Sequence, residues 1–130
     1  MKPSEIFNIL ADKVSEVCEV RKEEIINGSK VQSVVNARVL LVQYLRRVGL
    51  SNDDIAKIVL TILNKDKDGY YPSDDDVKRK AKGVDKMFSC YSQHCLESYA
   101  FCLMSKEIKE FCHETYNDLY IYGMKELPTK

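Results

Sequence analysis

The stretch SKVQSVVNARVLLVQYLRRVGLSNDDIAKIV, residues 29–59, decides the fold. Its first part carries apolar side chains on most sides of a helical wheel, which predicts a buried central helix over residues 29–48. The apolar positions are Val31, Val34, Val35, Leu41, Tyr44, Leu45 and Val48. Gly49 ends this helix. Ser51 and Asp54 have the spacing of a capping box, which predicts that the next helix begins there.

Helical periodicity extends over the rest of the chain, and no alternating strand pattern competes with it. Further helices are predicted at residues 4–19, at 20–26 before Asn27-Gly28, from Ser51 to about 63, and at about 74–88. Residues 90–123 fit one long helix or two. We therefore expect an all-α fold of five to seven helices. Residues 1–88 would form a helical domain, and residues 89–130 a helical extension packed on the same core.

The composition is that of an ordinary globular domain. The chain has 130 residues, which is about the size of one domain. Its 20 basic and 20 acidic residues cancel, so only the distribution of charge can indicate a partner. No signal peptide is visible, and no apolar run approaches the roughly 18 residues of a spanning helix. We expect a cytoplasmic protein without a membrane segment.

Five cysteines are an odd number for a secreted disulfide framework. They are Cys18, Cys90, Cys95, Cys102 and Cys112, and all lie in segments with helical periodicity. We interpret them as small buried side chains in a reducing compartment. A zinc site is the alternative, because His94 precedes Cys95 and His113 follows Cys112. Adjacent helical residues point about 100° apart, and no C-x-x-C pair exists, so we expect no metal and no cofactor.

Positive charge is concentrated in two segments. Residues 25–52 contain four basic residues and no acid, whereas residues 53–76 contain three lysines and seven acids. Residues 77–86 contain five basic residues and one acid. Two basic helices that share a face would bind the phosphates of duplex DNA, and the alternative is a pair of ordinary solvated faces. The candidate DNA-binding residues are Lys30, Arg38, Arg46, Arg47, Lys78, Arg79 and Lys82.

Arg38 has an unusual position on the helical wheel of residues 29–48. The polar stripe of this helix is made by Gln32, Asn36, Gln43, Arg46 and Arg47. Arg38 lies about 120° from the middle of that stripe, beside Val42 and Leu45. A guanidinium in such a place either reaches a fixed partner or extends its charge to water. The alternative to a DNA contact is a salt bridge to a neighbouring helix, such as the one carrying Asp53 and Asp54.

The order of these segments resembles the C-terminal DNA-binding domain of the DnaA replication initiator, in the Trp-repressor-like group of helix-turn-helix folds. In that family a short helix ends in Ser-Lys or Ser-Arg, a long buried helix opens with Ala-Arg, and a Leu-Ser-x-x-x-Ile helix follows. The matching pieces here are Ser29-Lys30, Ala37-Arg38 and Leu50-Ser51 with Ile55. The resemblance covers residues 4–60. It implies that Lys30 and Arg38 contact DNA near the recognition helix.

The chain departs from that family after residue 60. The family's recognition helix begins with a Gly-Arg-Asp-His-Thr-Thr signature that reads bases, and this chain has the loop NKDKDGYYP, residues 64–72, followed by Asp74-Asp75-Asp76. Three carboxylates at a helix N-terminus favour the helix dipole but repel phosphates. We therefore expect DNA binding without the family's base recognition.

The same loop has a second possible meaning. Asn64, Asp66, Asp68, Gly69 and Asp75 stand at positions 1, 3, 5, 6 and 12 of a calcium-loop template. Position 9 is Pro72, and position 12 is Asp rather than the longer Glu. A solvated turn, with Asp and Gly in their usual roles, is the simpler interpretation.

No convergent set of nucleophile, base and metal ligands is visible, so we expect a protein without catalytic activity. Our main hypothesis is a DNA-binding or DNA-linked accessory protein. The alternative is a helical interaction module with a protein partner or a homodimer contact on the C-terminal helices. Several tyrosines there could form such a surface: Tyr91, Tyr99, Tyr116, Tyr120 and Tyr122.

Overall fold

The computed structural model describes residues 2–116, and the regular structure within them is entirely α-helical. The helices are α1 (Pro3–Cys18), α2 (Lys22–Asn27), α3 (Gln32–Arg47), α4 (Asn52–Leu63), α5 (Asp74–Ser89), α6 (Tyr91–Glu97) and α7 (Tyr99–Thr115). The predicted all-α class is confirmed. The C-terminal segment forms two helices that meet at Ser98. The part of that prediction beyond residue 116, including Tyr120 and Tyr122, lies outside the described residues.

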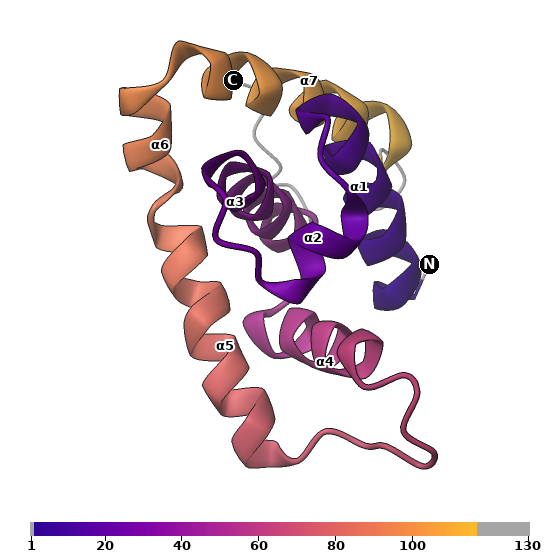
Figure 1. Cartoon of the computed structure of the whole chain (residues 1–130). Helices are drawn as coiled ribbons and strands as arrows, with labels where there is room; N and C mark the ends of the chain where they lie inside the picture. Colours follow the sequence, from indigo (N-terminus) through magenta and orange to yellow (C-terminus); the bar gives the residue numbers. More distant parts are fainter. Residues whose placement is uncertain (1, 117–130) are drawn as a thin grey trace.

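Helix α3 is the centre of the fold (Figure 1). In this view α1 and α2 lie on one side of it and α5 on the other, while α4 lies below it and α6 and α7 lie above it. Residues 39–45 of α3 are all buried, as predicted for a central helix. Burial of apolar area at about 25 cal/mol per Å² makes this helix the main contributor to the hydrophobic stabilisation. Phe101, Ile108 and Cys112 of α7 belong to the same hydrophobic cluster.

The helix ends follow the local sequence. Pro3 stands in the first turn of α1, and Gly28 ends α2 with a φ of 88°, a left-handed conformation that suits glycine. The Ser51 hydroxyl accepts a hydrogen bond from the Asp54 amide, and the Asp54 carboxylate accepts one from the Ser51 amide. This is the predicted capping box. Ser73 caps α5 in the same way, through its hydroxyl alone.

Two predicted helix starts were wrong by two or three residues. Helix α2 begins at Lys22 rather than at residue 20, because the chain turns at Glu19 with a φ of 55°. Helix α3 begins at Gln32 rather than at residue 29. Val31, counted among the core positions of the sequence, is the extended residue before the helix and is 59% exposed. Val31 therefore fits the helical spacing of apolar residues in the sequence but does not belong to the hydrophobic core.

Polar groups inside the fold tie α3 to α6 and α7. The Tyr44 hydroxyl donates to the Ser105 main-chain oxygen at 3.0 Å and lies 2.8 Å from the Ser105 hydroxyl. The Tyr91 hydroxyl also contacts the Ser105 hydroxyl, from α6. Desolvation by burial raises the pKa of Tyr44 far above its ordinary value, so the phenol stays protonated. Three hydroxyls thus satisfy one another in a largely apolar region.

All five cysteines are free thiols. Cys112 is fully buried and the other four are half-buried. Burial raises the pKa of the Cys112 thiol to about 12. It also raises the pKa of Cys18 to about 11, with a smaller contribution from the Glu107 carboxylate. These two thiols are therefore neutral near pH 7.

Candidate nucleic-acid interface

An apolar cavity of about 250 Å³ lies where the α2–α3 loop meets α3, α4 and α5. Three cationic residues line it together with the apolar side chains: Lys30 of the loop, Arg38 of α3 and Lys80 of α5. Lys30 is exposed and Lys80 is half-buried. Within residues 2–116 neither lysine has a hydrogen bond or an ion pair. The two basic segments of the sequence thus meet at this cavity, and their charges are available to a ligand.

The rotation of α5 decides which of its basic residues face solvent. Its apolar positions Val77, Ala81 and Val84 are buried, and the first two pack against Ala56 and Leu60 of α4. The basic residues on the remaining faces are Lys78, Arg79, Lys82 and Lys86, all exposed. Their helical spacing spreads them along the outer side of the helix. Helix α5 therefore presents a row of cations to solvent. Within the described residues, Arg79 is the one of these four that forms an ion pair, with Asp76 at 3.3 Å.

The first turn of α5 is acidic. Asp74, Asp75 and Asp76 follow the capping residue Ser73. These carboxylates stabilise the positive end of the helix dipole. Because they occupy the first turn, the cationic row lies in the middle and the C-terminal half of the helix. An anion that approaches α5 is therefore attracted to its flank and repelled from its N-terminal end.

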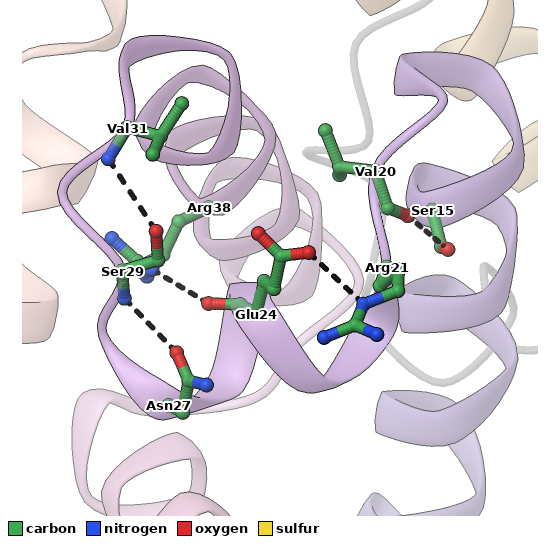
Figure 2. A network of polar contacts seen from close by, with 8 residues as sticks. All are labelled: Ser15, Val20, Arg21, Glu24, Asn27, Ser29, Val31 and Arg38. Carbon is green, nitrogen blue, oxygen red and sulfur yellow. Dashed lines mark hydrogen bonds and ion pairs between the residues drawn. The ribbon is translucent and has the colours of Figure 1, made fainter.

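Arg38 is bound to the end of α2. Its Nε donates to the Ile25 main-chain oxygen at 2.7 Å, and its Nη2 donates to the Glu24 main-chain oxygen at 3.0 Å. Figure 2 shows the side chain extending from α3 to the main chain of α2. The last four carbonyls of a helix lack partners within the helix, so Arg38 satisfies two of them and opposes the negative end of its dipole.

Arg38 reaches a fixed partner on a neighbouring helix, as one of the sequence-based alternatives expected, but through carbonyls rather than a carboxylate. Its partners are main-chain carbonyls, and neither Asp53 nor Asp54 forms an ion pair with it. The side chain is half-buried, and this desolvation lowers its pKa from the ordinary arginine value. Two of its three guanidinium nitrogens are committed to these carbonyls, so the side chain is fixed within the fold.

Arg46 holds three helices together. Its Nη1 donates to the Asn52 side-chain oxygen at the start of α4 and lies 3.9 Å from the Asp85 carboxylate of α5. Its guanidinium carbon lies 4.4 Å from the centre of the Phe88 ring. Asn52 also donates to Asp85, at 3.2 Å. The charge of Arg46 is thus offset inside the protein, where it fixes the end of α3 against α4 and α5.

Arg47 points to another part of the molecule. Its guanidinium carbon lies 5.2 Å from the ring centre of Tyr91 and 5.5 Å from that of Tyr44. It lines a second cavity, between α3, α6 and α7. Of the seven predicted contact residues, the structure leaves four exposed (Lys30, Lys78, Arg79 and Lys82) and engages the three arginines of α3 within the fold.

Lys80 was not among the predicted contacts, although it lies in the basic segment. A helical wheel shows that Lys80 lies on an apolar face of its helix, because Lys80, Val84 and Met87 are spaced i, i+4 and i+7. All three line the cavity with Lys30. The wheel cannot say which other helix lies opposite that face, and so the sequence alone does not bring Lys80 and Lys30 together.

The loop of residues 64–72, for which the calcium template was the alternative to a solvated turn, contains turn and helix-end contacts. Within residues 2–116 no group of three or more His, Cys, Asp or Glu side chains is placed to hold a metal ion. Asn64, at the first template position, donates its side-chain amide to the Leu60 carbonyl at 2.8 Å and closes α4. Gly69 has a φ of 69° and allows the turn at Lys67–Tyr70. The loop geometry is accounted for by turn and helix-end contacts.

Comparison with protein-family models, with curated proteins and with solved structures gives no match. Among the described helices none is both long and apolar enough to cross a membrane.

Proposed function

We propose that this protein binds duplex DNA through the phosphate backbone, without base recognition and without catalysis. The surface consists of Lys30 on the α2–α3 loop and of Lys78, Arg79, Lys80 and Lys82 on α5, and we call it the α5 basic surface. The observation that carries the proposal is the meeting of Lys30 and Lys80 at one cavity, from segments far apart in the sequence.

Several features of this surface suit phosphates. The side chains of Lys30, Lys78, Lys80 and Lys82 have no ion pair or hydrogen bond within the described part of the chain. Binding to a phosphate would release condensed counterions from DNA, which is the main source of non-specific affinity. The single ion pair of Arg79 is exposed, and such pairs contribute little, so this guanidinium can exchange partners.

The sequence resemblance supports the same function. Residues 4–60 resemble the C-terminal domain of DnaA, in which two consecutive helices form the DNA-binding helix-turn-helix. In this proposal α4 and α5 correspond to that pair. Helix α5 lacks the base-reading signature and carries Asp74, Asp75 and Asp76 at its N-terminus. It therefore contacts backbone phosphates along its flank rather than inserting its N-terminal end toward base edges.

The test is a salt titration of DNA binding by a lysine-pair variant. In the double variant Lys78→Gln, Lys82→Gln, the slope of log affinity against log salt should fall by about 2, near 0.9 for each phosphate that is no longer bound. The matched control is Lys106→Gln, Lys109→Gln, which removes the same charge from α7. Fluorescence anisotropy with a random duplex of about 20 base pairs measures both. An equal decrease in the two variants would show that net charge alone, not the α5 basic surface, drives binding.

A second candidate function rests on a different surface. Leu96, Tyr99 and Leu103 lie around the α6–α7 junction and are 83%, 78% and 50% exposed. Exposed apolar side chains close together in the sequence favour a protein partner or a homodimer contact. Sedimentation equilibrium of the wild type and of Leu96→Asp tests this function. A dimer that the substitution dissociates would support it, and a monomer at all concentrations would count against the homodimer.

A further inference from the structure

The second cavity, between α3, α6 and α7, has a volume of about 390 Å³. It lies at the opposite end of α3 from Lys30, on the side where α6 and α7 cover the fold (Figure 1). Arg47, Lys106 and Lys109 line it, together with one carboxylate, Glu110. Its volume falls within the range of small-molecule pockets, roughly 300–1,000 Å³, and is too small for a nucleic-acid duplex.

The cations in this cavity are crowded. Lys106 and Lys109 are one helical turn apart on α7, and Arg47 faces them from α3. The pKa of Lys109 is lowered, first by burial and then by the positive charges of Arg47 and Lys106. Among the described residues no carboxylate forms an ion pair with any of the three. Like charges gathered at one place destabilise the folded state, and the Glu110 carboxylate, which raises the pKa of Lys109, offsets only part of this repulsion.

The cavity is also held in shape. The Arg47 guanidinium lies over the Tyr91 and Tyr44 rings. In the amide orientation that satisfies both side chains, the Gln43 oxygen accepts from the Arg47 Nε and Nη2, the latter at 2.8 Å. This leaves Nη1 for a ligand. The Ser105 and Tyr91 hydroxyls, which contact each other, line the same space. Hydroxyls and a planar guanidinium fixed by their own contacts are the groups that hold phosphate oxygens in proteins.

We infer that this cavity binds the phosphate group of a small molecule through Arg47, Lys106 and Lys109. A phosphate carries up to two negative charges, which three cations and one carboxylate neutralise. The volume leaves room for a group attached to the phosphate. The site shares no residue with the α5 basic surface. A negative result for DNA binding therefore does not exclude phosphate binding in this cavity.

The test is isothermal titration calorimetry at constant ionic strength with inorganic phosphate, adenosine monophosphate and adenosine. Inorganic phosphate and the monophosphate should bind, and adenosine should not. A tighter Kd for the monophosphate would identify an organic phosphate as the ligand, whereas equal values would identify phosphate itself. Lys106→Gln, Lys109→Gln should raise the Kd at least about tenfold, which corresponds to about 1.4 kcal/mol. The matched control Lys65→Gln, Lys67→Gln, which removes the same charge from the exposed loop after α4, should leave it unchanged.

A second measurement does not depend on variants. Cys95 and Cys102 line the cavity, whereas Cys90 does not. Bound phosphate should slow the alkylation of Cys95 and Cys102 in the wild type, relative to Cys90, as measured by peptide mass spectrometry. Absence of binding by both phosphate probes, or an unchanged Kd in the α7 variant together with unchanged alkylation, overturns the inference.

Discussion

Replacement of Arg38 by methionine should destabilise the protein without a primary effect on DNA affinity. Methionine keeps most of the apolar stem that lines the cavity and removes the guanidinium. The Glu24 and Ile25 carbonyls then lose the donors that Arg38 places 3.0 and 2.7 Å away. Both carbonyls belong to the last turn of α2, so no amide within the helix replaces these donors.

The magnitude follows from these two bonds. A hydrogen bond to a charged group contributes about 1.5–3 kcal/mol, and Arg38 makes two. The site is half-buried, so water can reach the carbonyls in part, and we expect a total loss of about 2 kcal/mol. For a chain of this length each kcal/mol corresponds to about 4 °C, which predicts a fall in the melting temperature of about 8 °C.

Arg21→Met is the matched control, because Arg21 lies near the same helix and pairs with the Glu24 carboxylate at 3.0 Å (Figure 2). The Arg21 side chain is 76% exposed, so its removal should change the unfolding free energy by less than about 0.5 kcal/mol. Urea denaturation followed by circular dichroism measures both variants. Equal stability of the two would refute the capping role of Arg38. Normal stability with weakened DNA binding would instead restore Arg38 as a phosphate contact.

Three further predictions concern the rest of the fold. Tyr44→Phe removes the donor to the Ser105 carbonyl and should lower the unfolding free energy by about 1–2 kcal/mol, whereas an unchanged urea midpoint would contradict the role of that hydroxyl. The pKa of Cys112 is raised to about 12 in the folded state from an ordinary 9.0, so its contribution to stability is complete below about pH 9 and is lost as the pH rises toward 12. The stability difference between wild type and Cys112→Ala should therefore shrink from pH 8 to pH 10 by up to about 1.4 kcal/mol, and a constant difference would argue against the shift. Millimolar calcium should leave the melting temperature unchanged, and an increase would revive the 64–75 loop as a calcium site.

Much of the fold follows from local sequence patterns. The apolar character of residues 39–45, interrupted only by Gln43, predicts the buried helix, because most faces of that segment suit the core. Gly28 and Ser51 mark helix ends through backbone conformation and capping, which are properties of one or two residues. The break at Ser98 was only one of two possibilities. The chain there has neither Gly nor Pro, but the Ser98 hydroxyl accepts a hydrogen bond from the Phe101 amide and so caps the start of α7.

The candidate site was less predictable, for a physical reason. Sequence shows which residues are charged, whereas function depends on which charges lack partners in the fold. Arg38 and Arg46 find their partners on other helices, and the acceptors for Arg38 are main-chain carbonyls that every residue possesses. The meeting of Lys30 and Lys80 is likewise set by the packing of α5 on α4, which no local pattern specifies.

The most direct test of the central claim is the salt dependence of wild-type binding to random duplex DNA. If the α5 basic surface binds about four to five phosphates, the slope of log affinity against log salt should be near −4. The Kd should be on the order of 10⁻⁴ to 10⁻⁶ M at physiological salt. The affinity should be the same for unrelated sequences. No detectable binding at about 50 mM salt, where attraction to phosphates is strongest, would contradict the claim that this protein binds DNA.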